Sequence, residues 1–450
     1  MFLARLVPHS VFVGLATLIF VPSTRAATLQ VGPGKRFAGI EQAYADAKPS
    51  DVILVHPLKD GRAYERVAVQ VRKSRLTFRA AGLESGARVK IDGRGYNYSG
   101  SGRVPRAIFQ FNADADGCVL EGFELTGASN NNSNGAGVRI NQASQVTVRY
   151  CEIHHNDMGI MSNGDGSLKS AMNQVIEHCV IHHNGNERHA GYNHNLYLGG
   201  TSVTLRFCDL HSPLTGQNVK SRAHYNHVEY SYIHHSANRE FDLVHARETA
   251  YSDSHAVLLG NIIVKDTLCR GNKGVIHFGA EGDGQHDGTL YLVQNTIVTP
   301  FITPVIDLSA SKAKAKLYGN LIHGTDRRQS NQVLASARNG ASLAGLSATN
   351  NWIADTFSNS LKSQTFREQN RIAKSPAGLF ANPREHDFHL TRSAPIAGAD
   401  ASAKIPLKIP NALGVKGGTV PFTWQYKHPA DKQLRKTENE RDFGALEFVN

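Results

Sequence analysis

The sequence predicts an all-β protein, a right-handed parallel β-helix with an N-terminal capping helix. The first observation is an internal repeat, in which a short β-prone run contains a small or amide residue followed by an aliphatic one. Copies such as YCEIHHN, HCVIHHN and GNLIHG recur at intervals of roughly 28 residues. The second observation is the Gly and Asn residues between these runs, which are typical of tight turns. Repeats of this kind bury their apolar faces only by stacking, so they predict the coils of a solenoid.

Stacking would place the repeated small residue in one inward column. Cys151, Cys179 and Cys208 occupy this position in three successive copies, and Asn residues occupy it in later ones. Stacked Asn side chains can hydrogen-bond from coil to coil, and buried thiols behave as small hydrophobes. The five cysteines are odd in number and lack CxxC spacing, so we expect no disulfide framework and favour packing over a metal or redox role. The column is expected to continue through Asn261, Asn295, Asn320 and Asn351.

Three segments are expected along the chain: 1–26 as a signal peptide, 27–355 as the β-helix with its cap, and 356–450 as final coils and an irregular covering segment. The first segment combines Arg5, an apolar stretch and small residues up to Ala27, which is the pattern of a cleavable secretory signal. After this segment the sequence contains no run of about 18 apolar residues, the length needed for a membrane-spanning helix. We therefore expect a periplasmic or secreted monomer of a Gram-negative bacterium.

The N-terminal cap is expected to be a helix in the stretch RFAGIEQAYADAK. Phe37, Ile40, Tyr44 and Ala47 would lie on one face of this helix, and the apolar strand VILV follows it. A cap is needed because the open end of a β-helix would expose unpaired strand edges.

The formal net charge of +11 favours a polyanionic partner through long-range attraction. Because the chain carries an export signal, we expect this partner to be an acidic polysaccharide and not a nucleic acid.

A second strand follows each ladder position, and six copies of it align as GVRIN, GIMSN, NLYLGG, NVKSR, EFDLVH and GVIHF. Successive side chains of a strand point to opposite faces. The apolar column would face the core, and it comprises Val138, Ile160, Leu196, Val219, Phe241 and Val275. Three outward columns would flank it: Asn195, Asn218 and Glu240; Tyr197, Lys220 and Asp242; and Gly199, Arg222 and Val244. Met161 and Ile276 would occupy the column of Lys220 in the adjoining coils.

This polar patch offers the groups needed for β-elimination on a uronic acid. Lys220 is the expected base, because the neighbouring cation Arg222 would favour its neutral form, although Asp242 would oppose this. Arg222 or Arg239 would neutralise the substrate carboxylate and stabilise the enolate-like intermediate. Tyr197 would donate the proton to the leaving oxygen. Further residues expected to contact the substrate are Arg139, His194, Asn195 and Asn218.

Calcium is the one cofactor that the patch suggests. Glu240 and Asp242 supply hard oxygen ligands, and a calcium ion could bridge them to the substrate carboxylate. The alternative is that Lys220, Asp242 and Glu240 form a solvated ion-pair ladder without a catalytic role.

Histidine pairs recur just after the ladder strand. His154–His155, His182–His183 and His234–His235 occupy one repeat position, which indicates stacking at a turn more than a metal stripe. His194 precedes the NLYLGG strand and is expected at the edge of the patch, in reach of the substrate.

The stretch NVKSRAHYNHVEYSYI resembles the lysine-serine strand of the chondroitinase B and alginate lyase family of parallel β-helix lyases. The resemblance implies that Lys220 is the Brønsted base and that Ser221 follows it. The family carries an arginine in the next coil, where this sequence reads DLVHA with Val244 and His245. Arg222, Arg239 or His245 would have to replace that arginine.

The leading hypothesis is thus an exported polysaccharide lyase that cleaves a uronate-containing chain. A glycoside hydrolase would use two carboxyl groups, for which Glu240 and Asp242 are available. A C5-epimerase would share the proton abstraction of the lyase. A non-catalytic glycan-binding β-helix is the fourth possibility, since fold does not fix function.

Overall fold

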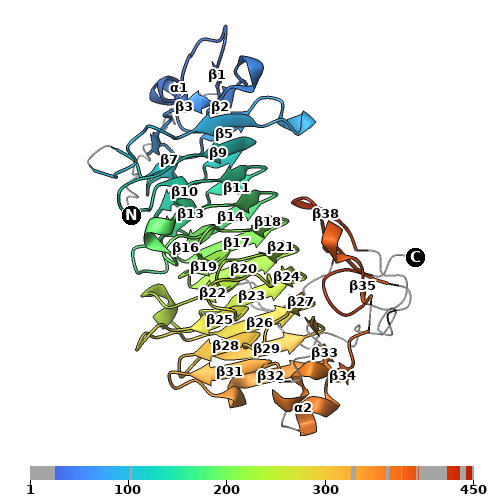
Figure 1. Cartoon of the computed structure of the whole chain (residues 1–450). Coiled ribbons are helices and arrows are strands. Elements are labelled where there is room, and N and C mark those ends of the chain that lie inside the picture. The colour runs from blue at the N-terminus through green and yellow to red at the C-terminus, as the bar shows by residue number, and fades with distance from the viewer. Residues whose placement is uncertain are drawn as a thin grey trace, which may run out of the picture.

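The prediction of a parallel β-helix is confirmed. The computed structural model describes residues 26–101, 104–325, 331–360, 364–376, 378–391, 394, 423–435 and 442–447. Three long parallel sheets run along the stack of coils, and most coils contribute one strand to each sheet (Figure 1). The predicted signal peptide lies outside the described residues except for Ala26.

The first sheet has twelve strands, in chain order along the stack. They are β1 (Thr28–Val31), β2 (Val52–Val55), β5 (Thr77–Ala80), β8 (Val119–Glu121), β11 (Thr147–Arg149), β14 (Gln174–Glu177), β17 (Ser202–Arg206), β20 (Tyr225–Glu229), β23 (Ala256–Leu259), β26 (Thr289–Val293), β29 (Lys314–Tyr318) and β32 (Leu346–Thr349).

The second sheet has ten strands and carries the residues singled out above. They are β4 (Val69–Val71), β7 (Ala107–Phe111), β10 (Ala136–Asn141), β13 (Met158–Asn163), β16 (Leu196–Leu198), β19 (Val219–Ser221), β22 (Phe241–Leu243), β25 (Ile276–Gly279), β28 (Ile306–Ser309) and β31 (Ala335–Arg338).

The third sheet has twelve strands. They are β3 (Tyr64–Glu65), β6 (Val89–Asp92), β9 (Phe123–Thr126), β12 (Glu152–His154), β15 (Val180–His182), β18 (Asp209–His211), β21 (Tyr232–His234), β24 (Ile262–Val264), β27 (Thr296–Thr299), β30 (Leu321–Gly324), β33 (Trp352–Ala354) and β34 (Arg371–Ala373).

The predicted inward column of cysteines and asparagines is present, and we call it the first ladder. Cys151, Cys179 and Cys208 are fully buried and unpaired, as expected for packing residues. Beyond them, each Asn accepts from its neighbour: Asn261 donates its backbone N–H (2.9 Å) and its amide (3.1 Å) to Asn295 Oδ1. The ladder then continues through Asn320, Asn351 and Asn370. It satisfies backbone and side-chain polar groups at a corner that water does not reach.

A second internal ladder was not foreseen, and it corrects one outward column. Asn195, Asn218 and Glu240 are fully buried, so the prediction that they face solvent is wrong. Asn184 donates to Asn195 Oδ1 (3.0 Å), Asn195 to Asn218 Oδ1 (2.8 Å), and Asn218 to Glu240 Oε2 (2.6 Å). Strict alternation fails because the strands of these coils are only three residues long, and the residue before each strand lies in the corner of the coil. We call this chain of contacts the corner ladder.

Helix α1 (Ile40–Asp46) packs against β1, β2 and β4 at the N-terminal end of the stack (Figure 1). Ile40 and Ala43 are its buried residues, flanked by buried Phe37 and Ala47, whereas Tyr44 is half-buried. Its role as a cap stays a prediction.

The second α-helix of the described residues is α2 (Gln364–Glu368), and short 3-10 turns lie at Lys59–Gly61, Leu83–Ser85, Glu187–His189, Glu248–Ala250, Leu343–Gly345, Asp355–Ser360 and Pro383–Glu385. No helix among the described residues is long and apolar enough to cross a membrane.

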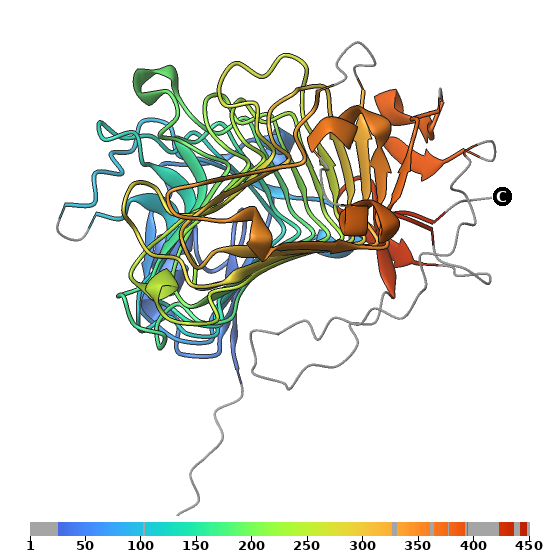
Figure 2. The same cartoon turned by 90° about the horizontal axis from the view of Figure 1, so that it is seen from below.

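The described C-terminal segments form two hairpins, β35 (Phe380–Asn382) with β36 (Asp387–Leu390) and β37 (Trp424–Lys427) with β38 (Asp431–Leu434). They lie against the third sheet, where the ring of Phe388 is 5.6 Å from that of Tyr232. Figures 1 and 2 show them on the side away from the second sheet. These hairpins therefore do not cover the second sheet, whose outward residues Tyr197 and Lys220 are partly exposed, whereas Asp242 and His277 are buried.

The first ladder predicts a stability effect. Replacement of Asn295 by Ala removes the acceptor of two Asn261 donors and leaves the carbonyl of Leu258 without its amide donor. We expect the free energy of unfolding in urea to fall by about 2–4 kcal/mol, because several buried polar groups lose their partners. The exposed Asn131→Ala variant should change it by less than about 0.5 kcal/mol. Equal effects of the two variants would contradict a contribution of the first ladder to the free energy of unfolding.

Candidate functional site

One outward column of the second sheet is confirmed by the strand register. Tyr197 on β16 pairs with Lys220 on β19, and Lys220 pairs with Asp242 on β22. The column continues with His277 and Asp307, so the prediction of Ile276 in this position is wrong. A one-residue slip in the alignment of GVIHF exchanged the two faces of β25. Five side chains, those of Tyr197, Lys220, Asp242, His277 and Asp307, thus lie on adjacent parallel strands about 4.8 Å apart.

Lys220 lies between two carboxylates. Its Nζ is 3.3 Å from Asp242 Oδ2 and 3.1 Å from Glu281 Oε1, and it lies 5.9 Å from the centre of the Tyr197 ring. Its side chain is 12% exposed, so the ammonium group meets solvent over a small area only. Strand β19 presents it outward because the flanking Val219 and Ser221 are buried.

Asp242 is the buried anion of the column. His277 Nδ1 is 2.7 Å and Arg239 Nη1 3.5 Å from its Oδ1. Burial alone would raise the pKa of Asp242, but the hydrogen bond from His277 and the charge of Lys220 outweigh it. The pKa therefore lies well below its ordinary value, and Asp242 is a carboxylate at neutral pH.

His277 was not among the predicted residues. Arg338 Nη2 lies 2.9 Å from His277 Nε2, and a guanidinium group can only donate. Nε2 must therefore accept, which places the ring proton on Nδ1, where it is donated to Asp242. Ser309 Oγ also contacts Nε2. His277 is thus a fixed donor to Asp242 and lies nearly out of solvent.

Arg222 connects Lys220 to a second group of residues. Its Nε donates to Tyr197 Oη at 3.0 Å, its Nη2 is 3.0 Å from Glu281 Oε2, and its Nη1 donates to the carbonyl of His245. The Nδ1 of His245 accepts from the backbone N–H of Glu281 (3.1 Å), and burial together with Arg222 lowers the pKa of this histidine. Val244 is fully buried, so its predicted outward position is wrong.

Two other predicted residues hold different positions. His194 is 2% exposed and accepts at Nδ1 from the backbone of Gln217 (3.2 Å), so a direct contact with substrate, as predicted, is blocked by burial. Burial, and then the charge of Lys220, lower its pKa to about 3. Arg239 joins the column from its edge, where Nη2 is 3.7 Å from Asp307 Oδ2.

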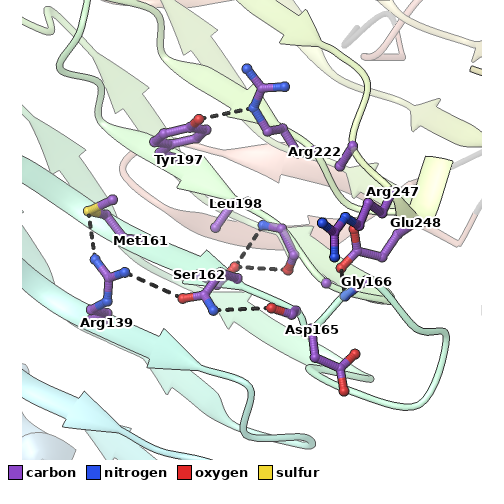
Figure 3. A pocket seen from close by; sticks show the side chains of 15 residues that line it. Arg139, Met161, Ser162, Asp165, Gly166, Tyr197, Leu198, Arg222, Arg247 and Glu248 are labelled. Carbon is purple, nitrogen blue, oxygen red and sulfur yellow. Dashed lines mark hydrogen bonds between the residues drawn. The ribbon is translucent and has the colours of Figure 1, made fainter. Parts of the chain in front are cut away.

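An open pocket of about 490 Å³ adjoins the column. Figure 3 shows Arg139, Tyr197, Arg222 and Arg247 around it, with Asp165 and Glu248 on one side. Arg139 contacts only the neutral atoms Met161 Sδ (3.5 Å) and Asn163 Oδ1 (3.4 Å) among the described residues. Of the arginines that line the pocket, Arg222 is paired with Glu281, whereas Arg139 has no direct carboxylate partner among the described residues.

The two carboxylates predicted to share calcium do not form one site. Glu240 ends the corner ladder, where Oε1 is 3.5 Å from Lys265 Nζ and also accepts from the backbone of Ser236 (3.0 Å). Asp242 is surrounded by cationic or donor groups instead. Within the described part of the chain, no cluster of three His, Cys, Asp or Glu residues has the geometry of a metal site. Because Glu240 is paired with Lys265 and Asp242 with His277 and Lys220, this donor set does not fit calcium.

The repeated histidines stack, as their spacing indicated. The rings of His154, His182, His211 and His234 follow one another at 4.9–5.0 Å along the third sheet. This column lies on a different sheet from Lys220 and takes no part in its surroundings.

Comparisons with known proteins give only distant likenesses. No family model and no curated protein matches the sequence. Among solved structures, the chain is similar to pectate lyase Pel9A (12% identity, TM-score 0.45, covering 95% of this chain and 97% of that one). It is also similar to an alginate lyase from Paenibacillus sp. str. FPU-7 (13% identity, TM-score 0.43, 78% and 98%) and to the pectin methylesterase PemA from Erwinia chrysanthemi (12% identity, TM-score 0.35, 76% and 95%). We base the function on the residues of this chain alone.

Asp242 predicts a pH-dependent stability. Its pKa is lower in the folded than in the unfolded chain, so its contribution is complete above the unfolded value of about 3.9 and is lost as the pH falls. We expect Asp242→Asn to reduce the free energy of unfolding by about 3–5 kcal/mol at neutral pH, since Lys220 and His277 lose their anion. The difference from wild type should shrink below about pH 4. Urea unfolding across pH, with the exposed Asp114→Asn as control, measures this, and a difference independent of pH would contradict it.

Proposed function

We propose that this chain is a polysaccharide lyase that cleaves a uronate-containing polysaccharide by β-elimination. The observation that carries the proposal is the contact of Arg222 with Tyr197 at the edge of an open cationic pocket, with Lys220 beside both. An acidic glycan entering this pocket would meet these groups, and the excess of basic residues in the chain would attract it.

The reaction breaks the C5–H bond of a uronate, forms the C4–C5 double bond and releases the oxygen at C4, which takes up a proton. Negative charge accumulates on the carboxylate while the C5 proton leaves. Fixed cations beside that carboxylate lower the barrier, because they are already oriented before the charge develops. Lys220 and Arg222 are placed for this role, since their cationic groups converge on one carboxylate, that of Glu281.

Tyr197 is the proton acceptor in this proposal. In this step Tyr197 acts as a phenolate, its own proton having been released to solvent, and becomes a phenol when it takes the C5 proton. Arg222 Nε, which donates to the Tyr197 oxygen, is placed to balance the phenolate charge. Lys220, by contrast, pairs as an ammonium group with two carboxylates and would have to lose its charge beside both before it could accept a proton. The same phenol can return the proton to the leaving oxygen. Lys220 as the base, expected from the family resemblance, is the competing assignment.

Asp242, His277 and Arg239 act as positioning residues. His277 fixes Asp242, and Asp242 holds the Lys220 ammonium in place. They make the cationic site rigid before substrate arrives, which is the condition for electrostatic catalysis.

The alternatives make different demands. A hydrolase built on Glu240 and Asp242 is not supported, because Glu240 is fully buried in the corner ladder. A C5-epimerase would exchange the C5 proton with solvent without forming an unsaturated product, and a binding protein would do neither. An action outside the cytoplasm rests on the signal predicted at 1–26 and belongs to the same proposal.

The lyase proposal is tested by following the near-ultraviolet absorbance of unsaturated products from alginate, pectate, glycosaminoglycans and bacterial exopolysaccharides. With the substrate that responds, Tyr197→Phe should lower kcat about 10²–10⁴-fold, because the proton acceptor is removed. Tyr150→Phe, an exposed tyrosine on the first sheet, should keep wild-type activity. Silence with every substrate class would refute the lyase.

Lys220→Arg separates the two assignments of the base. If Lys220 holds the carboxylate, the arginine retains the charge and part of the activity. If Lys220 accepts the proton, Lys220→Arg and Lys220→Ala should be equally inactive, because arginine does not deprotonate in proteins.

The pocket arginine Arg139 should govern binding more than turnover. We expect Arg139→Gln to raise KM about tenfold with little change in kcat, because it loses an interaction made equally with substrate and transition state. The effect should disappear with a substrate whose carboxylates are esterified. Initial rates at several substrate concentrations measure this, with Arg36→Gln on the distant N-terminal segment as control. A fall in kcat at unchanged KM would place Arg139 in the chemical step instead.

A further inference from the structure

The carboxylate of Glu281 bridges the two cations of the site. Its Oε1 is 3.1 Å from Lys220 Nζ, and its Oε2 is 3.0 Å from Arg222 Nη2. We propose that Glu281 occupies the position of a uronate carboxylate and is displaced when substrate binds. This inference rests on the proposed function and identifies the group of the substrate that Lys220 and Arg222 recognise.

The contact has the form of a ligand contact. Each oxygen of one carboxylate meets a different cation, which is the arrangement that a uronate carboxylate would reproduce with its own two oxygens. Lys220 and Arg222 belong to the second sheet and the turn that follows β19, whereas Glu281 comes from the loop after β25. The two cations, which we call the receptor, and Glu281, which we call its occupant, thus belong to coils that are two steps apart in the stack.

The occupant is the most weakly held of the three groups. The side chain of Glu281 is 45% exposed, against 12% for Lys220 and 27% for Arg222. Ion pairs with an exposed partner are weak, because solvent competes for both charges. Burial raises the pKa of Glu281, but the charges of Lys220 and Arg222 lower it by more than burial raises it. Glu281 is therefore a carboxylate at neutral pH.

The receptor keeps its shape without Glu281. Lys220 would remain paired with Asp242, and Arg222 would remain hydrogen-bonded to Tyr197 and to the carbonyl of His245. The two cations would therefore be in place before substrate binds, and the free-energy cost of binding would include the displacement of only one side chain, that of Glu281.

The loop that carries Glu281 is anchored at its base and open at its tip. His286 Nδ1 lies 2.8 Å from the carbonyl of Gly279, which closes the loop. Gly282, next to Glu281, has φ +66° and no heavy atom within 4 Å of the position of a Cβ. Because 45% of the Glu281 side chain is exposed, it can turn into solvent without a rearrangement of the coil.

The test measures binding without turnover. Calorimetric titrations with D-glucuronate, D-mannuronate and D-galacturonate, and with the corresponding neutral hexoses, would compare wild type, Glu281→Gln and Glu281→Ala. We expect both variants to bind at least one uronate about fivefold more tightly than wild type, because the internal competitor has lost its charge. The neutral hexoses should gain nothing. Asp283→Asn removes a charge from the same loop without a contact to Lys220 or Arg222 among the described residues, and should bind as wild type does.

Unchanged or weaker uronate binding by both Glu281 variants, or no binding by any of the proteins, would overturn the inference. Thermal unfolding of each variant shows that it is folded when binding is measured. The result is separable from the lyase proposal: tighter binding together with silence in the absorbance assay would refute the lyase and leave the carboxylate site standing. Elimination activity without a change in uronate affinity would support the lyase and refute the role inferred for Glu281.

Discussion

The register between stacked coils is the constraint on which the rest of this molecule depends. Each coil is bound to the next by parallel backbone hydrogen bonds in three sheets, and a shift of one residue would turn every side chain of a strand to the other face. The ladders make such a shift costly. Asn261, Asn295 and Asn320 satisfy one another only when they lie at the same corner in successive coils. The same register places Tyr197, Lys220 and Asp242 side by side on the outside.

The interior changes character where the outer column becomes charged. The corner ladder consists of amides through Asn184, Asn195 and Asn218, and then ends in the buried pair of Glu240 with Lys265. Asp242 lies two residues from Glu240 on the same chain and holds the outer cation Lys220. Replacing an amide ladder by ions is unfavourable for stability unless each ion is paired. The coils that carry the charged column therefore hold ion pairs both inside and outside.

The sequence allowed some of these features to be predicted because they repeat. The first ladder and the column through Tyr197, Lys220 and Asp242 follow from the spacing of similar motifs. The buried positions of Asn195 and Asn218 could not be predicted from alternation, because strands of three residues leave the neighbouring residue in a corner. His277 was missed because the copy GVIHF aligns equally well one residue away.

The residues that pair with the column of Lys220 could not be predicted from the repeat for a different reason. Glu281 lies in a loop, and Arg338 lies two coils beyond His277, so only the stacking of distant segments brings them to the site. A motif alignment compares equivalent positions of each coil and contains no information on such residues. The resemblance of the NVKSR stretch to a family of lyases likewise concerned Lys220, Ser221 and one position of the next coil, and it contained no information on Glu281 or Arg338.

The balance of charge explains what the assembled site can exchange. Lys220, Arg222, Arg239 and Arg338 are paired with three carboxylates, those of Asp242, Asp307 and Glu281. Asp242 and Asp307 lie on strands and are largely buried, so their removal would disturb the sheet. Glu281 lies on a loop and is partly exposed. Among these anions it is the one that can leave at little cost, and an anion that takes its place meets cations already held by the coils. A neutral sugar would leave that pair of cations without a counter-charge, so the proposed displacement of Glu281 would favour an acidic sugar over a neutral one.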